Sequence, residues 1–140
     1  MEVRFYSSRG RFLITELILT DGLFLSQGAY YTASAATHRL ITISLSKQLD
    51  ARVFVPNYRL APDTLFPGPV HDAAAAYLRL TEDLKIPAAN ILIAGDSAGA
   101  GLTVALMMYL RDEGYPLPGG AILMCPWVGE LRKKLSLSLM

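Results

Sequence analysis

Residues 91–99, Ile91-Leu92-Ile93-Ala94-Gly95-Asp96-Ser97-Ala98-Gly99, decide the fold of this chain. They begin as a short apolar run, typical of a buried strand, and lead into a helical pattern that extends to about Arg111. At such a strand-to-helix junction, the sequence G-x-S-x-G places a serine hydroxyl on a sharp turn. Glycines flank the serine because larger side chains would collide with the neighbouring strand and helix. The stretch therefore predicts an exposed, nucleophilic Ser97, with an ordinary strand–glycine–helix connection as the alternative.

The composition is that of one globular domain. The 140 residues are 52% hydrophobic and 18% charged, which favours a well-buried core and excludes disorder. The net charge is only +1, so the composition indicates no nucleic-acid or acidic-membrane partner. Cys125 is the single cysteine, which excludes an internal disulfide, and we expect it to be a small buried side chain at the end of a strand.

The sequence contains no pattern typical of a membrane or metalloprotein. Glu16 and Asp21 interrupt the apolar stretch from Phe12 to Leu25, which argues against a signal peptide. No uninterrupted apolar run is long enough to span a membrane. No group of His, Cys and carboxylate residues has metal-ligand spacing. We therefore expect a cytoplasmic protein that needs no metal or other cofactor.

Strand-like and helix-like segments alternate along the chain. Strands are expected at residues 2–6, 52–56, 91–94 and 120–125, and helices at 34–49, 69–84 and 98–111. Segment 11–25 is also β-rich, but its Asp21-Gly22 pair favours a hairpin turn. Because apolar strands separated by helices indicate a parallel sheet covered on both faces, we expect an α/β three-layer sandwich.

Apolar residues at helical spacing predict which face of each helix is buried. The second helix is expected to begin at a proline, and the third to stop at Gly114. The predicted inward residues are Ile41, Leu45 and Leu49 in the first helix, Val70, Ala74, Tyr77 and Leu78 in the second, and Ala98, Leu102, Ala105, Leu106, Tyr109 and Leu110 in the third.

Further motifs accompany the serine in a fixed order. They are Gln27-Gly28-Ala29-Tyr30, His38-Arg39, Tyr58-Arg59-Leu60-Ala61-Pro62-Asp63, Phe66-Pro67, Asp72-Ala73 and Pro126-Trp127-Val128. The ordered set resembles the hormone-sensitive-lipase-like branch of the α/β-hydrolases, which contains carboxylesterases, lipases and arylacetamide-deacetylase-like enzymes. The resemblance covers about residues 28–128 and leaves 129–140 as an atypical tail. It implies a single, partial α/β-hydrolase domain, in which strand 52–56 lies beside the strand entering Gly28, followed by strands 91–94 and 120–125.

The resemblance also implies a chemistry. Ser97 would attack the carbonyl of a small-molecule carboxylic ester and form an acyl-enzyme. The backbone N–H groups of Gly28, Ala29 and Ala98 would form the oxyanion hole. Ser26 and Gln27 stand where the family has a histidine and a glycine, and we expect this departure to weaken the hole.

The acid and base of the family's catalytic triad have no counterpart in this chain. We interpret His38 and His71, the only two histidines, as structural, and Asp96 as ordering the turn around Ser97. Two functions stay open: a carboxylesterase or lipase, and a catalytically inactive truncated fragment or ligand-binding pseudoenzyme of the same fold. We expect the isolated chain to be inactive or very weak.

Two further contacts are expected. Arg59 should form a charge-assisted bond with Asp63 or Asp72 that holds the Tyr-Arg-Leu-Ala-Pro turn. Strand 120–125 should leave an open apolar edge, which favours self-association, although the alternating segment 135–139 could cover it.

Overall fold

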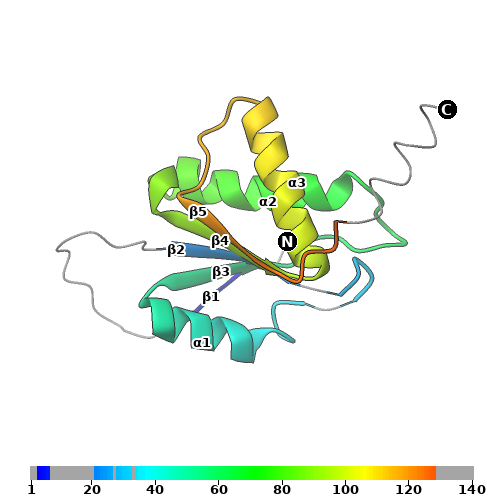
Figure 1. Cartoon of the computed structure of the whole chain (residues 1–140), viewed down its shortest axis with the longest axis horizontal. Helices are drawn as coiled ribbons and strands as arrows, with labels where there is room; N and C mark the ends of the chain where they lie inside the picture. The colour runs from blue at the N-terminus through cyan, green and yellow to red at the C-terminus, as the bar shows by residue number, and fades with distance from the viewer. Residues whose placement is uncertain (1–2, 7–20, 27, 33, 129–140) are drawn as a thin grey trace.

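The computed structural model describes residues 3–6, 21–26, 28–32 and 34–128 (Figure 1). The sequence-based expectations for residues 11–20, Gln27 and 129–140 lie outside the described residues. The strands are β1 Val3–Tyr6, β2 Asp21–Leu25, β3 Arg52–Pro56, β4 Ile91–Asp96 and β5 Gly120–Met124. The helices are α1 Arg39–Leu49, α2 Gly68–Leu78 and α3 Ala98–Asp112, with a π-helical turn at Arg79–Asp83 and a 3₁₀ turn at Ala88–Asn90.

The strands form one mostly parallel sheet in the order β1-β3-β2-β4-β5. β3, β2, β4 and β5 run parallel, whereas β1 pairs with β3 in the antiparallel sense. In this register, Leu25 of β2 lies opposite Gly95 of β4, and Asp96 lies opposite Met124 of β5. The predicted strand order is confirmed, and β4 lies inside the sheet.

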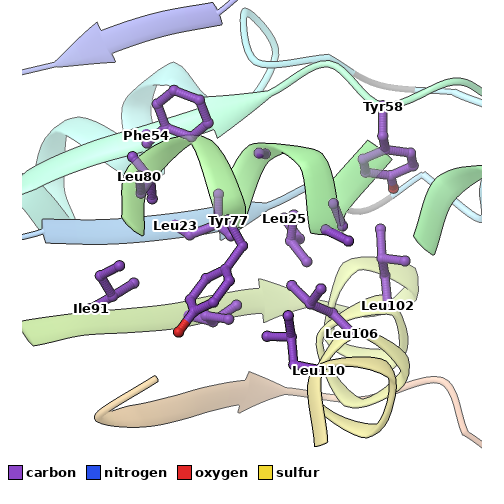
Figure 2. Packing of buried hydrophobic residues seen from close by; sticks show 14 of the residues in the cluster. Leu23, Leu25, Phe54, Tyr58, Tyr77, Leu80, Ile91, Leu102, Leu106 and Leu110 are labelled. Atoms are coloured by element: carbon purple, nitrogen blue, oxygen red, sulfur yellow. The ribbon is translucent and has the colours of Figure 1, made fainter. Parts of the chain in front are cut away.

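Helices cover both faces of the sheet, with α1 on one side and α2 and α3 on the other (Figure 1). Side chains alternate along each strand, so Leu23 and Leu25 pack with α2 and α3 (Figure 2). Phe24 packs in a second cluster on the α1 side. The three-layer α/β sandwich is confirmed.

α3 follows its predicted pattern. Leu102, Leu106 and Leu110 are completely buried against the sheet, and Ala105 and Tyr109 pack at the border of the same cluster. The chain leaves the helix at Gly114, whose φ of +75° belongs to the left-handed region, and Tyr115 N–H donates to the Leu110 carbonyl at 2.8 Å.

α2 begins with a proline in its first turn, as predicted, but it is shorter than expected. The regular helix ends at Leu78, which is only partly buried, and continues as the π-helical turn Arg79–Asp83. The buried Tyr77 hydroxyl donates to the Pro116 carbonyl at 2.7 Å, and burial raises the pKa of Tyr77 to about 12. This bond fixes α2 to the segment that leads into β5.

The predicted helix 34–49 was wrong in its start, and of its three predicted inward residues only Leu45 packs against the core, where it is partly buried. α1 begins at Arg39, and its buried side chains are Thr42 and Ser46. The Thr42 hydroxyl donates to the His38 carbonyl at 3.2 Å, and the Ser46 hydroxyl donates to the Ala51 carbonyl at 2.7 Å. Because both hydroxyls are satisfied locally, these small side chains can lie against the sheet, while Ile41 and Leu49 stay 42% exposed.

The predicted hairpin turn at Asp21-Gly22 was also wrong, because both residues belong to β2. β2 has a parallel neighbour on each side, and Gly22 lies opposite both Val53 and Leu92. The Asp21 carboxylate accepts two hydrogen bonds from the Arg52 guanidinium, at 2.6 and 2.7 Å. In a turn, the Asp21 carboxylate would accept hydrogen bonds from nearby backbone N–H groups, whereas here Arg52 of the neighbouring strand donates them.

β5 is the last strand of the sheet in the described part of the chain, as expected. Ile122 and Leu123 are 38% and 41% exposed, so this end of the sheet carries uncovered apolar surface. Cys125, at the end of β5, is exposed, and the expectation that it is buried was wrong because no described element covers this edge.

Within these described ranges, no helix is long and apolar enough to cross a membrane.

Candidate active site

Ser97 lies on a sharp turn between β4 and α3, at the carboxyl end of its strand, where open α/β sheets place their ligands. Its φ of 52° and ψ of −114° form a strained conformation, which costs on the order of 1–3 kcal/mol. Three backbone bonds hold it: Ser97 N–H donates to the Met124 carbonyl at 2.9 Å, and the Ser97 carbonyl accepts from Gly101 and Trp127, each at 3.1 Å. The side chain is partly exposed.

The two glycines of the turn are required by close backbone contacts. A Cβ at Gly95 would lie 2.8 Å from the Ala100 nitrogen. A Cβ at Gly99 would lie 2.6 Å from the Leu25 carbonyl carbon and 2.8 Å from the next carbonyl oxygen in the chain. β4, α3 and the end of β2 therefore meet at this turn without room for a methyl group, which is the reason inferred from the sequence.

The loop that follows β2 has an unusual backbone. Gly28, Ala29 and Tyr30 have φ values of 132°, 52° and 64°. For the two non-glycine residues this left-handed region is unfavourable, by about 1–3 kcal/mol each. The Gly28 carbonyl accepts from the N–H groups of Tyr31 at 2.8 Å and Thr32 at 2.9 Å, which closes a tight turn.

The expected oxyanion donors are backbone N–H groups of this loop and of the first residue of α3. No hydrogen bond between described residues uses the N–H of Gly28, Ala29 or Ala98. Gly28 and Ala29 line the same hollow as Ser97, and Ala98 follows Ser97 directly as the first residue of α3. The structure thus brings together the serine and two of its three expected donors in one hollow.

The hollow has a volume of about 710 Å³, which is in the range of small-molecule sites. Its lining residues are Gly28, Ala29, Tyr31, Thr32, Thr37, His38, Ile41 and Ser97.

The structure places His38 in the wall of this hollow, a position that the sequence did not indicate. His38 is only 4% exposed, and its ring packs against Phe24 with 6.0 Å between centroids. Its Nε2 lies 3.7 Å from an Asp96 carboxylate oxygen, and its Nδ1 lies 3.1 Å from the Thr37 hydroxyl and 3.4 Å from the Ser34 carbonyl. Nδ1 is therefore within hydrogen-bond distance of groups other than Ser97, and Nε2 lies near the Asp96 carboxylate, which favours a structural role.

His71 does not reach the hollow. It lies on α2, and its ring packs against Tyr109 of α3 with 6.1 Å between centroids. The structure therefore separates one of the two histidines of the chain from Ser97.

Arg59 pairs with Asp72 rather than with Asp63. The guanidinium donates from Nη2 to Oδ1 at 2.9 Å and from Nε to Oδ2 at 2.9 Å, and the Arg59 N–H donates to Oδ2 at 2.8 Å. Partial burial raises the pKa of Asp72, but the side-chain and backbone hydrogen bonds from Arg59 outweigh it, so that the pKa lies below its ordinary value. The pair fastens the Tyr-Arg-Leu-Ala-Pro turn to α2.

Comparisons with known proteins agree with this geometry. The family model described as an alpha/beta hydrolase fold matches residues 23–138. An acetyl-hydrolase of Streptomyces hygroscopicus is 43% identical over 105 residues, which are 75% of this chain and 35% of that protein. An esterase of Acinetobacter venetianus is 30% identical over 127 residues, which are 90% of this chain and 42% of that protein.

A solved structure is similar as well. The crystal structure of an esterase from the bacterial hormone-sensitive lipase family has a TM-score of 0.80 and 35% sequence identity, and the match covers 90% of this chain and 40% of that one. The chain thus spans well under half the length of these relatives. Its sheet, its serine turn and these matches together assign it to the α/β-hydrolase fold family, in the hormone-sensitive-lipase-like branch.

Proposed function

We propose that Ser97 is the nucleophile of a carboxylic ester hydrolase of the carboxylesterase or lipase type. The observation that carries this proposal is the opening of the strained Ser97 turn onto the hollow that Gly28 and Ala29 line. Relatives named acetyl-hydrolase and esterase support the same class of reaction. A small-molecule ester is the substrate that fits a hollow of about 710 Å³.

The reaction would proceed in two steps. The Ser97 oxygen attacks the ester carbonyl carbon, and the carbonyl oxygen becomes an oxyanion that accepts hydrogen bonds from the N–H groups of Gly28, Ala29 and Ala98. The bond to the alcohol then breaks, the alcohol leaves with a proton, and an acyl group stays on Ser97. Water hydrolyses this acyl-enzyme and releases the acid. Each oxyanion donor is worth about 10²–10³-fold in turnover, and the N-terminus of α3 adds a favourable dipole.

The base that takes the Ser97 proton is, in this proposal, not among the 140 residues. His71 lies away from the hollow, Nδ1 of His38 is within hydrogen-bond distance of Thr37 and Ser34, and its Nε2 lies near the Asp96 carboxylate. Without a base, Ser97 stays a neutral alcohol and a weak nucleophile. The absence of a base near Ser97 among the described residues favours a second candidate function, which is binding of an ester or acyl ligand without turnover.

Turnover of p-nitrophenyl acetate and butyrate by the 140-residue chain distinguishes the hydrolase function from the binding function. The chain alone should hydrolyse neither ester faster than Ser97→Ala does. Added imidazole should act as a substitute base and produce an increment that Ser97→Ala lacks. The double substitution Ser26→His and Gln27→Gly should not restore turnover, because the base is still absent. Ser97-dependent turnover without imidazole would show that a residue of the chain is the base, and the absence of any increment would favour the binding function.

We also propose that the protein is cytoplasmic and that it self-associates through the edge of β5.

A further inference from the structure

The loop that carries Gly28 and Ala29 needs an external support. Its two non-glycine residues with positive φ, Ala29 and Tyr30, persist only where neighbouring groups fix them. Its own hydrogen bonds, from Tyr31 and Thr32 to the Gly28 carbonyl, close the turn but do not fix its place relative to Ser97.

The support comes from the segment Tyr58–Ala61, which holds the loop at both ends. The Tyr58 hydroxyl donates to the Ser26 carbonyl at 2.6 Å, before the loop. The Ala61 N–H donates to the Tyr30 carbonyl at 2.7 Å, behind it. The rings of Tyr30 and Tyr58 also pack together, with 6.3 Å between centroids.

This segment is itself rigidly placed. Tyr58 is 6% exposed and belongs to the main core with α2 and α3 (Figure 2). Its neighbour Arg59 is bound through both its guanidinium and its N–H to Asp72 of α2. The contact of Arg59 with α2 therefore fixes the position of Tyr58, and Tyr58 in turn fixes the position of the loop.

The geometry points to Tyr58 as a positioning residue for the oxyanion hole, which acts through the Ser26 carbonyl on the N–H groups of Gly28 and Ala29. The inference rests on the proposed function of Ser97. Tyr58 does not line the hollow, so it acts on the reaction only through the loop.

Tyr58→Phe removes the hydroxyl and keeps the ring. Tyr77→Phe is the matched control, because Tyr77 is also buried and its hydroxyl also donates to a backbone carbonyl, that of Pro116, at 2.7 Å. The first measurement is amide hydrogen exchange of the ¹⁵N-labelled chain at Tyr31 and Thr32. Tyr58→Phe should accelerate exchange there by about tenfold or more, whereas Tyr77→Phe should leave it unchanged.

The second measurement is phosphonylation of Ser97 by a fluorophosphonate in the presence of imidazole. Displacement of the donors should slow labelling by about 10- to 100-fold in Tyr58→Phe and not in Tyr77→Phe. The ³¹P resonance of the adduct should also move toward that of the denatured adduct, because the phosphonyl oxygen loses hydrogen bonds. A purely structural role for Tyr58 would not change this resonance.

Equal exchange in the two variants, or unchanged labelling and ³¹P resonance in Tyr58→Phe, would overturn the inference. If Ser97 of the unsubstituted chain takes no probe at all, the proposed function fails, and labelling no longer reports on Tyr58. Exchange at Tyr31 and Thr32 would then still show whether Tyr58 holds the loop, which keeps the two failures distinguishable.

Discussion

Gly99→Ala adds only one methyl group, but we expect it to destabilise the protein strongly. The added methyl carbon would lie 2.6 Å from the Leu25 carbonyl carbon and 2.8 Å from the Ser26 oxygen. Since non-bonded carbons normally approach to about 3.5–4.0 Å, the overlap is about 1 Å and involves backbone atoms only. The end of β2 cannot yield easily, because Leu25 is paired with Gly95 of β4. We therefore expect a loss of about 3 kcal/mol or more in the free energy of unfolding.

Gly22→Ala is the matched control, because Gly22 lies in β2, the strand whose end Gly99 contacts. A methyl carbon there would lie 3.7 Å from its nearest neighbours, the Arg52 oxygen and a Val53 methyl group, which is ordinary contact. The free energy of unfolding should change by less than about 1 kcal/mol, because the lower entropy of the unfolded chain compensates for small adjustments. Urea unfolding followed by far-UV circular dichroism measures both. Similar losses for Gly99→Ala and Gly22→Ala would refute the argument that the Ser97 turn is sterically closed.

Three further changes test other parts of the structure. Asp72→Asn should lower stability at pH 7. The lowered pKa of Asp72 means that its contribution is fully present above the unfolded carboxyl pKa of about 3.9 and is lost as the pH falls through the folded value. The difference in urea midpoint should therefore begin to shrink below about pH 3.9 and continue to shrink as the pH falls further, and a difference that does not shrink would contradict the pairing. Leu106→Ala, at a fully buried position, should cost about 2–5 kcal/mol in thermal or urea unfolding, while Met108→Ala, at a half-exposed position of α3, should cost under about 0.5 kcal/mol, and equal costs would contradict the packing of α3. Light scattering at micromolar concentration should show self-association that Leu123→Lys on β5 reduces, and a monodisperse unsubstituted monomer would contradict an associating edge.

The sequence predicted the serine turn because its constraints are local. A strand, a serine between two glycines and a strong helical pattern require only a few adjacent residues, and the contacts at Gly95 and Gly99 agree with the steric reason. The strand order, in contrast, came from the resemblance to a family, because nothing in the strands themselves determines which one lies beside β2.

The errors arose where tertiary contacts outweigh local preference. Hydrophobic periodicity favoured Ile41, Leu45 and Leu49 as the buried face of α1, but only Leu45 packs against the core. The sheet instead accommodates the smaller Thr42 and Ser46, whose hydroxyls bind nearby carbonyls. Turn propensity misassigned Asp21, whose partner Arg52 lies on the neighbouring strand.

The site shows the same limit. The charge of Arg59 predicted an acidic partner, but only the fold selects Asp72 over Asp63. Similarly, no sequence signal placed His38 in the hollow of Ser97, because the two residues are distant in the chain and line one hollow only in the folded protein.

Mapping the site of fluorophosphonate labelling tests the central claim most directly. The 140-residue chain would be treated with the probe and imidazole, digested, and analysed by mass spectrometry for the modified residue. The account predicts one adduct, on Ser97, whose formation depends on imidazole and is absent from Ser97→Ala. Labelling spread over other serines, or undiminished in Ser97→Ala, would contradict the claim that this turn presents the nucleophile.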